Sequence, residues 1–393
     1  MRERLLFITA ENPFPQDSGG KLRTGNILSL LQDKYEVDLI TYRGREGTAD
    51  TPTRPQLNVY EVQRSMNYRK AMLRSLYTWR NCSYMSHADV DMRRTIVSLC
   101  REHQYRQVFI SHSLLGCCID IVRQALPEAE IITDAHNFES GLSAQLAGSK
   151  RGLAKLYFSL NAFWTRRDER KLMDKTNVLL TTSEEDGQSF RALSGKNASK
   201  VHVIPNFIRI GDYSDAPRAA QENWIILPGN MNYFPNIHAA AYFFRDIYPS
   251  VKAQIPGVKW YIVGRDVHPE VAALAGKDPS IVITGYVDSV AEYVRKAKVV
   301  VAPLLEGSGT RLKILEAWAL GTPVVSSSKG AEGLRYEHSR NILIADEPQA
   351  FADSIVRLFR NEQEGRQLAE GARQTLMAHY EAGSVKSKLL ALV

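Results

Sequence analysis

The sequence predicts an α/β protein built from two doubly wound domains. Its 393 residues exceed the ~250–300 residues at which a single hydrophobic core usually stops growing. With 44% hydrophobic and 24% charged residues, the composition is that of a globular protein and excludes disordered, collagen-like and membrane-spanning classes. In both halves short β-branched runs alternate with helical stretches, which is the pattern of parallel sheets covered by helices on both faces.

Seven runs in the first half have the length and composition of strands, and helical stretches separate most of them. They cover residues 4–10, 37–42, 57–62, 107–112, 131–136, 177–183 and 201–205. The first run meets Glu11 and Asn12 too early for the core of a signal peptide, so we interpret it as the first strand of a cytoplasmic protein. No apolar run approaches the ~18 residues of a bilayer span.

The second half begins the same architecture afresh, with each strand followed by a turn and usually a helix. Its predicted strands cover residues 224–229, 259–264, 281–285, 299–303 and 323–328. The polar stretch 206–222 is typical of a linker. We therefore expect domains at 1–205 and 223–377, followed by a C-terminal helix at 378–393 that could pack back on the N-terminal domain. If the carboxyl ends of both sheets face one cleft, ligands should bind there.

The four cysteines predict neither a disulfide framework nor a metal site. Cys82 and Cys100 stand alone, while Cys117 and Cys118 are adjacent in a predicted buried helix, so no paired CxxC spacing is present. We expect a reducing compartment, no zinc and no other bound metal.

The formal charge of +7 is concentrated in the first half. Residues 1–205 hold 29 Lys and Arg against 23 Asp and Glu, whereas the later residues hold 21 against 20. Two basic segments, 64–80 and 150–171, also carry leucine and aromatic side chains, a combination that suits an anionic membrane surface. The alternative is an ordinary helix with a solvated cationic face and an apolar core face. Nucleic acid is not favoured, because no nucleic-acid motif is present.

The strongest local signal is the segment 303–325. A buried strand ends, a glycine loop follows, and Thr310 is expected to start and cap a helix that stops at Gly321. Gly307 and Gly309 would let an anion approach the backbone, while amide groups and the helix dipole point toward it. A phosphate is therefore the natural ligand of this loop.

Charged residues of the same helix extend the predicted phosphate site. Arg311 and Lys313 lie in its first turn, where a cation opposes the helix dipole unless a bound anion compensates it. Glu316 lies further along, where a carboxylate could accept hydrogen bonds from sugar hydroxyls. The alternatives are that both cations are simply solvated and that Glu316 only favours the dipole.

Two loops of the first half carry further polar candidates. Gly19 and Gly20 follow the first predicted strand, where a Gly-Gly pair could be no more than a turn, and Lys21 or Arg23 could add positive charge. His136 ends a predicted strand, and on general grounds a histidine there is more often structural than catalytic.

These motifs, in this order and spacing, make the sequence resemble the retaining glycosyltransferases of the GT-B architecture, in the large family 4. The likeness covers nearly the whole chain and rests on residues 6–15, 18–23, 134–139, 183–186, 205–206, 228–236, 263–264, 285–288, 309–316 and 330–333. Residues 309–316 are similar to a subset of bacterial polysaccharide transferases. The resemblance implies two Rossmann-like domains facing across a cleft, the first on the acceptor side and the second binding a nucleotide sugar.

The resemblance also implies roles for the residues around the donor. Arg311 and Lys313 would neutralise the donor diphosphate, and Glu316 would hold the ribose hydroxyls. The remaining donor-binding positions would be Gly19, Gly20, Tyr286, Val287, Gly307, Ser308, Gly309 and Thr310. Tyr286 and Val287 would read a nucleobase edge, unless they form only an ordinary βα turn.

On the acceptor side the resemblance favours a functional His136 beside the sugar being transferred. Asn137 and Glu139 would then lie near acceptor hydroxyls. The sequence departs from the family at one donor position, because Ser308 stands where the first of two glutamates seven residues apart is often found. Glu306, two residues earlier, cannot simply be equated with that glutamate.

The implied activity is transfer of a sugar from a nucleotide-diphosphate sugar to a hydroxyl acceptor, with retention of the anomeric configuration. The context would be surface polysaccharide or other glycoconjugate biosynthesis, with a glycan, lipid-linked glycan or small-molecule acceptor at the inner face of a membrane. No metal is needed if amides and cations disperse the charge of the leaving diphosphate. A nucleotide-sugar 2-epimerase and a non-enzymatic sugar-binding protein remain as alternatives.

Overall fold

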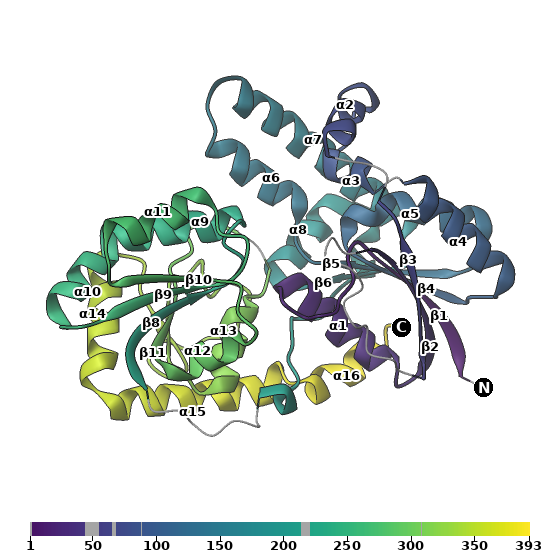
Figure 1. Cartoon of the computed structure of the whole chain (residues 1–393). Helices are drawn as coiled ribbons and strands as arrows, with labels where there is room; N and C mark the ends of the chain where they lie inside the picture. Colours follow the sequence, from purple (N-terminus) through teal and green to yellow (C-terminus); the bar gives the residue numbers. More distant parts are fainter. Residues whose placement is uncertain (1, 44–54, 65–67, 88, 214–220, 308) are drawn as a thin grey trace. The chain divides into compact units, whose positions relative to one another are not determined.

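The computed structural model confirms two α/β units with parallel sheets (Figure 1). It describes the chain except residues 1, 44–54, 65–67, 88, 214–220 and 308. One unit comprises Met1–Pro205 together with Lys386–Val393, and the other comprises Asn206–Val385.

The first unit contains a seven-stranded parallel sheet in the order β3-β2-β1-β4-β5-β6-β7. Its strands are β1 (Glu3–Thr9), β2 (Tyr35–Tyr42), β3 (Leu57–Val62), β4 (Gln107–Ser111), β5 (Glu130–Ala135), β6 (Val178–Thr181) and β7 (Val201–Val203). Because both faces are covered, the central strand β1 is apolar throughout its buried part, and Leu5 to Ile8 are fully buried.

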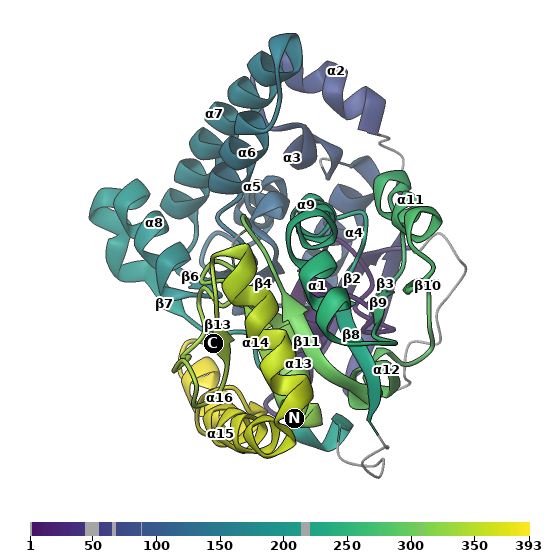
Figure 2. The same ribbon diagram turned by 90° about the vertical axis from the view of Figure 1, so that its left-hand side faces the viewer.

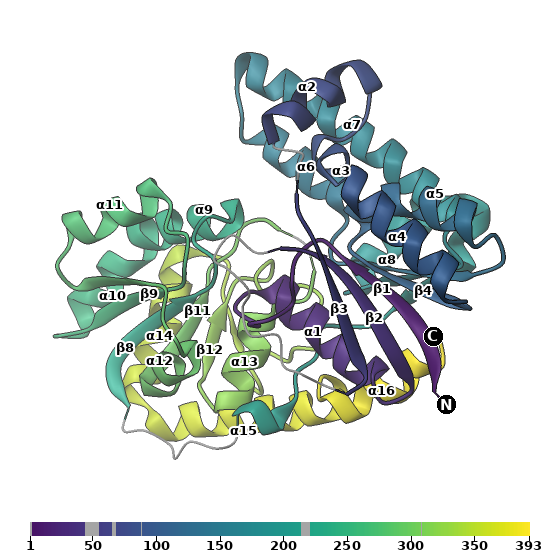
Figure 3. The same cartoon turned by 45° about the vertical axis from the view of Figure 1, so that its right-hand side comes forward.

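Helices cover both faces of this sheet. They are α1 (Gly19–Leu31), α2 (Tyr68–Thr78), α3 (Cys82–Ser86), α4 (Val90–Glu102), α5 (Gly116–Ala125), α6 (Glu139–Gly148), α7 (Gly152–Lys175) and α8 (Glu184–Ser194), with short 3-10 turns η1 (Ser113–Leu115) and η2 (Gly195–Lys200). Figure 3 shows α1 on one side of the sheet and α4 and α5 on the other. In Figure 2, α6 and α7 lie along each other and extend beyond the sheet, with α2 nearby.

The second unit repeats the arrangement with six parallel strands in the order β10-β9-β8-β11-β12-β13. They are β8 (Glu222–Pro228), β9 (Lys259–Val263), β10 (Ile281–Gly285), β11 (Ala297–Ala302), β12 (Val324–Ser326) and β13 (Leu343–Ile344). The helices are η3 (Ile210–Tyr213), α9 (Phe234–Tyr242), the π-helical turn η4 (Phe243–Ile247), α10 (Tyr248–Gln254), α11 (Pro269–Lys277), α12 (Val290–Lys296), α13 (Leu312–Leu320), α14 (Pro348–Arg360) and α15 (Glu362–His379).

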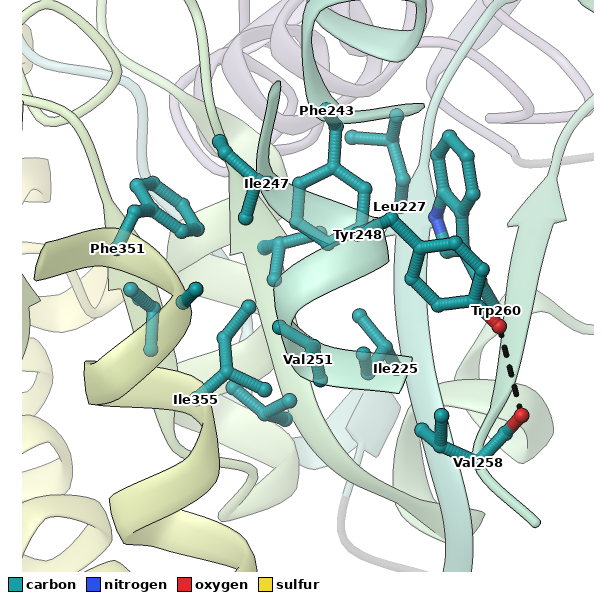
Figure 4. Close-up of a cluster of buried hydrophobic side chains, with 14 of the residues drawn as sticks. Ile225, Leu227, Phe243, Ile247, Tyr248, Val251, Val258, Trp260, Phe351 and Ile355 are labelled. Atoms are coloured by element: carbon teal, nitrogen blue, oxygen red, sulfur yellow. Dashed lines mark hydrogen bonds between the residues drawn. The ribbon is translucent and has the colours of Figure 1, made fainter. Parts of the chain in front are cut away.

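A group of aromatic side chains packs among aliphatic ones in the core of the second unit (Figure 4). The rings of Phe243 and Trp260 lie 4.8 Å apart, and Tyr248 packs 5.5 Å from the same tryptophan. The buried hydroxyl of Tyr248 donates to the carbonyl of Val258 at 3.4 Å and also lies 2.8 Å from the hydroxyl of Ser280. This core fixes β8, whose carboxyl end leads into the Gly229 loop of the candidate site.

The structure corrects three predicted boundaries. The strand β13 has only two residues and was not predicted, because such a short run carries no periodicity. His112 and His136 follow β4 and β5 instead of ending them. The predicted C-terminal helix 378–393 is interrupted, because the carbonyl of Tyr380 accepts the backbone amide of Ile208, and α16 (Ala382–Leu390) starts only after this contact.

Candidate active site

The glycine loop of the second unit connects β11 to α13. Gly307 has φ +116° and Gly309 has φ +77°, a region that side chains other than glycine rarely adopt. A Cβ atom on Gly307 would lie 3.0 Å from Nη2 of Arg311. Glycine therefore lets the guanidinium group lie against the loop backbone. Ser308 lies outside the described residues.

The helix after this loop starts later than the sequence predicts. Thr310 was expected to start and cap it, but Arg311 is the N-cap residue, without a side-chain cap, and the first helical residue is Leu312. The carbonyl of Thr310 accepts a hydrogen bond from the Asn206 side chain at 2.8 Å. The prediction was wrong because the left-handed Gly309 and the non-helical Arg311 (ψ 92°) delay the helical conformation.

Lys313 is half-buried at the start of α13 and points to the loop after β8. Its Nζ atom donates to Oδ1 of Asn236 at 2.8 Å. A Cβ atom on Gly229, which has φ +143°, would lie 3.3 Å from this Nζ. Burial and, to a smaller extent, the nearby Arg311 charge together lower the pKa of Lys313 to about 7, while Glu316 acts in the opposite direction. A bound anion would favour the protonated amine.

Glu316 lies one turn beyond Lys313 and contacts η3. Its Oε1 atom accepts a hydrogen bond from the hydroxyl of Tyr213 at 3.1 Å. Burial raises the pKa of Glu316 to about 7, although the Tyr213 hydrogen bond and Lys313 both lower it. Arg295 donates to the carbonyl of Tyr213 at 2.5 Å and so fixes this segment. Sequence reasoning missed Tyr213, because it lies in the segment that we expected to be a linker.

The other residues considered for the donor-binding site lie apart from this cluster. Glu306 pairs with His238 of α9, so its carboxylate ties the loop to that helix. Tyr286 and Val287 follow β10, which β9 and β8 separate from β11. Three strand spacings place these two residues roughly 14 Å across the sheet from the glycine loop. The Tyr286 side chain is exposed.

In the first unit, the start of α1 meets the end of β5. Ser18 caps α1 by accepting the backbone amide of Lys21 at 3.4 Å. Gly19 and Gly20 are the first two residues of α1, and a Cβ atom on Gly20 would lie 3.7 Å from Nδ1 of His136. The structure therefore brings the Gly-Gly pair and His136 together, as the paired strand ends of β1 and β4 and of β4 and β5 require.

A buried ion pair between Arg23 and Asp134 lies next to His136. Arg23 donates to both carboxylate oxygens of Asp134, at 2.8 and 2.5 Å, and to the carbonyl of Ile204 at 3.0 Å. Oδ2 of Asp134 lies 3.2 Å from Nε2 of His136. Burial alone would raise the pKa of Asp134, but Arg23 and His136 outweigh it and hold this pKa well below its usual range. Arg23 is thus committed to the interior and adds no charge to the loop surface, while Lys21 pairs with Asp17 at 2.9 Å.

A second histidine, which sequence reasoning missed, lies beside His136. The ring centroids of His112 and His136 are 4.9 Å apart, and Nε2 of His112 lies 3.6 Å from Oε1 of Glu139. His112 has φ +104°, a strained conformation for a residue with a side chain. Its pKa is held well below the usual value by burial and then by His136. Its position directly after β4, as His136 follows β5, was the available signal.

Acidic side chains complete this edge of the first sheet. Asn137 donates to Oε1 of Glu139 at 3.1 Å, and burial raises the pKa of Glu139 to about 7. Glu169 of α7 accepts the backbone amides of Glu139 and Ser140, at 2.8 and 3.3 Å, which fixes the start of α6. Burial raises the pKa of Glu169 to about 8. The edge therefore offers imidazole, amide and carboxyl groups suited to recognising hydroxyls.

The part of the chain that the structure describes contains neither a metal-binding cluster nor a membrane-spanning helix. In that part of the chain, no three or more His, Cys, Asp and Glu side chains are grouped as a metal site would require. None of the helices there is both long and apolar enough to cross a membrane.

The fold and the comparisons with known proteins indicate the class of protein. Residues 222–361 match the family model described as "Glycosyl transferases group 1". Over its full length the chain has the two-domain fold of GT-B glycosyltransferases. Sucrose-phosphate synthase from Thermosynechococcus elongatus superposes with a TM-score of 0.76 at 16% identity, covering 100% of this chain and 98% of that one. These findings support a glycosyltransferase of the GT-B type.

Particular relatives extend the comparison. The Anabaena protein HepE, solved with UDP-glucose, has a TM-score of 0.71 at 14% identity and covers 99% of this chain and 98% of its own. An uncharacterized 44.6 kDa protein in the cps region of Klebsiella pneumoniae is 21% identical over 98% of both chains. A phosphatidyl-myo-inositol mannosyltransferase of Mycobacterium leprae is 28% identical over 48% of this chain and 51% of its own.

Proposed function

We propose that this protein is a retaining glycosyltransferase of family 4 type that moves a hexosyl group from a nucleotide-diphosphate sugar to a hydroxyl acceptor. The observation that carries the proposal is the glycine loop after β11, with Arg311, Lys313 and Glu316 at the start of the following helix. Its context would be surface polysaccharide or another glycoconjugate. The relative in the cps region and the solved complex with UDP-glucose support this assignment.

The diphosphate would bind at the glycine loop. Left-handed Gly307 and Gly309 open the backbone to a phosphate, and the amides at the start of α13 point their positive dipole toward it. Arg311 and Lys313 would then stabilise the negative charge that develops on the leaving diphosphate. These groups supply that stabilisation without a metal ion, so we propose a metal-independent reaction.

The nucleoside would extend from the loop along the edge of the second sheet. Glu316 would accept hydrogen bonds from ribose hydroxyls, with Tyr213 fixing its carboxylate. Tyr286 and Val287, roughly 14 Å away by strand spacing, are at a distance that suits a base at the other end of an extended nucleoside diphosphate. Their backbone groups would read its edge.

The first unit would supply the groups that hold the transferred sugar and the acceptor. His136 projects beside Gly20, and Asp134 fixes its ring, so we assign His136 to the hydroxyls of the transferred sugar. Asn137 and Glu139 would bind acceptor hydroxyls. In the proposed step the bond from the anomeric carbon to the phosphate oxygen breaks, the acceptor oxygen attacks from the same face, and its proton passes to the departing phosphate oxygen.

A panel of nucleotide sugars tests the proposal. A ligand at 100 times its dissociation constant stabilises a protein by roughly 2.7 kcal/mol, so thermal shifts with UDP-, GDP-, ADP- and dTDP-sugars should single out one base. The chosen donor is then incubated with candidate acceptors, and proton NMR of the product reports the anomeric configuration. Retention supports the proposal. Inversion would contradict it, as would release of an epimerised sugar without any acceptor or binding of free sugar without nucleotide.

A further inference from the structure

We propose that an exposed apolar surface on α2 and α7 of the first unit inserts into an anionic lipid bilayer. Of the fourteen large apolar side chains that are exposed among the described residues, eight lie on these two helices and the residue that follows α2. We call this set the α2/α7 surface: Leu73, Leu76, Tyr77, Trp79, Leu153, Leu156, Leu160 and Phe163. Such a concentration is uncommon on a surface that faces only water.

On α7 the exposed apolar residues form one stripe. Leu153, Leu156, Leu160 and Phe163 follow at intervals of three and four residues, which places them on one face of the helix. Leu153 is 85% exposed and Phe163 is 63% exposed. The buried residues of α7 lie further along, from Trp164 onward, so the first three turns carry their leucines on the outside.

The segment that follows α2 is fastened to α7. The backbone amide of Asn81, just after α2, donates to Oδ2 of Asp168 at 3.1 Å, and its side chain donates to Thr165 at 2.5 Å. The ring of Trp79 contacts that of Trp164, with centroids 6.5 Å apart. In Figures 1 and 3 both helices extend away from the first sheet.

Trp79 combines a strained backbone with an exposed side chain. Its φ is +56°, a left-handed conformation that costs free energy for any side chain and is usually left to glycine or asparagine. The residue nevertheless keeps its indole ring 62% exposed. An amphipathic ring held outward in this way is typical of residues that lie at the level of lipid headgroups.

The charge of the α2/α7 surface indicates which kind of partner it binds. No Asp or Glu occurs in residues 68–87 or 150–167. Lys150, Arg151, Lys155 and Arg166 are exposed, and none of the four makes an ion pair in the part of the chain that the structure describes. The leucine and aromatic side chains are complementary to the acyl chains of a bilayer, and the unpaired cations beside them are complementary to anionic lipid headgroups. A second copy of the chain would instead bring the same cations face to face.

Vesicle flotation with the whole chain tests the proposal. We expect the protein to float with vesicles containing 30% phosphatidylglycerol in phosphatidylcholine, and to partition about tenfold less to phosphatidylcholine alone. Raising the salt from 0.1 to 1 M shortens the screening length from about 10 to about 3 Å and should weaken the charge-dependent part. Failure to float with anionic vesicles at 0.1 M salt overturns the proposal.

Paired variants separate this surface from general stickiness. Leu153→Ser with Phe163→Ser should reduce flotation at least about tenfold, because apolar insertion is lost. The control, Val90→Ser with Met377→Ser, removes two other exposed apolar side chains and should float like the parent. If both pairs float like the parent, or both fail equally, the α2/α7 surface is not the docking site.

A matched pair of charge variants tests the cations. Lys155→Glu with Arg166→Glu should lose anionic selectivity, whereas Arg101→Glu with Arg373→Glu, which makes the same change in net charge at exposed sites elsewhere, should not. Equal loss in both pairs would mean that net charge, and not this surface, attracts the vesicle.

Tryptophan quenching locates the contact. Of the five tryptophans, Trp164, Trp260 and Trp318 are buried, and Trp224 in β8 of the second unit is partly buried, whereas Trp79 is exposed. Brominated lipids should therefore quench the parent, and Trp79→Phe should abolish most of this quenching without abolishing flotation. Quenching that persists in Trp79→Phe would contradict this orientation. A dimer in solution that Leu153→Ser with Phe163→Ser abolishes, without vesicle binding, would assign the surface to a second copy and overturn the proposal.

Discussion

Binding of a diphosphate beside Lys313 should take up a proton from solution. Burial lowers the pKa of this amine to about 7, so at pH 8 about nine in ten side chains are neutral in the free protein. The negative charge of a bound diphosphate favours the ammonium form and raises this pKa. Binding at pH 8 should therefore take up about 0.9 proton per site.

At pH 8 the neighbouring ionisable groups contribute little to the proton uptake that accompanies binding. The pKa of Glu316 is raised to about 7, so its carboxyl is already mostly ionised and can release only about 0.1 proton. The terminal phosphate of a nucleoside diphosphate loses its last proton near pH ~6. Above pH ~7 the affinity should accordingly weaken by up to about tenfold, or 1.36 kcal/mol, for each pH unit until the pKa of the complex is reached.

Isothermal titration calorimetry measures the uptake directly. Titrating UDP at pH 8 in HEPES and in Tris, two phosphate-free buffers with different heats of ionisation, gives the number of protons from the difference in observed heat. Lys313→Met should abolish the uptake, while Lys296→Met, on exposed α12 surface, should leave it unchanged. Zero uptake by the parent, or equal uptake by Lys313→Met, would refute this reasoning.

Three further substitutions test the remaining groups of the candidate site. Glu316→Gln should lower kcat/KM about tenfold to a hundredfold in transfer assays with a single donor, because a hydrogen bond to a charged group contributes ~1.5–3 kcal/mol. The control, Glu292→Gln, should leave kcat/KM unchanged. Asp134→Asn should lower the urea-derived free energy of unfolding by about 3–5 kcal/mol, because Arg23 is left buried without its charge partner; a loss below ~1 kcal/mol would contradict the role of this pair. Glu169→Gln should raise the urea midpoint more at pH 8 than at pH 5. The pKa of the Glu169 carboxyl is raised in the folded state, so the parent protein loses stability as the pH rises from about 4.5 to about 8, and the variant does not. The opposite pH trend would argue against a buried carboxyl at this position.

The sequence predicted the sheets well because parallel strands buried on both faces are continuous apolar runs. Leu5 to Ile8 and Val299 to Ala302 are fully buried and carry no alternation that could be confused with an exposed sheet. The glycine loop was equally visible, because Gly307 and Gly309 between a strand and a helix have few structural alternatives. Local signals of this kind require no knowledge of distant partners.

The partners of the site residues could not be predicted, because they come from distant parts of the chain. Arg23 and Asp134 are 111 residues apart, and Tyr213 and Glu316 are 103 residues apart. No periodicity or spacing reports which buried groups meet across helices and strand ends. The pKa directions of Lys313 and Glu316 depend on the same burial and neighbours, so they too required the structure.

The central claim is that the glycine loop and the start of α13 bind the diphosphate of a sugar donor. Calorimetry of UDP and of uridine with the parent, Arg311→Ala and Arg311→Lys tests it most directly. We expect Arg311→Ala to weaken UDP about tenfold to a hundredfold, since a charge-assisted hydrogen bond contributes ~1.5–3 kcal/mol, and to leave uridine within about twofold. Arg311→Lys should recover part of the loss. Equal weakening of UDP and uridine, or no effect on either, would contradict the account.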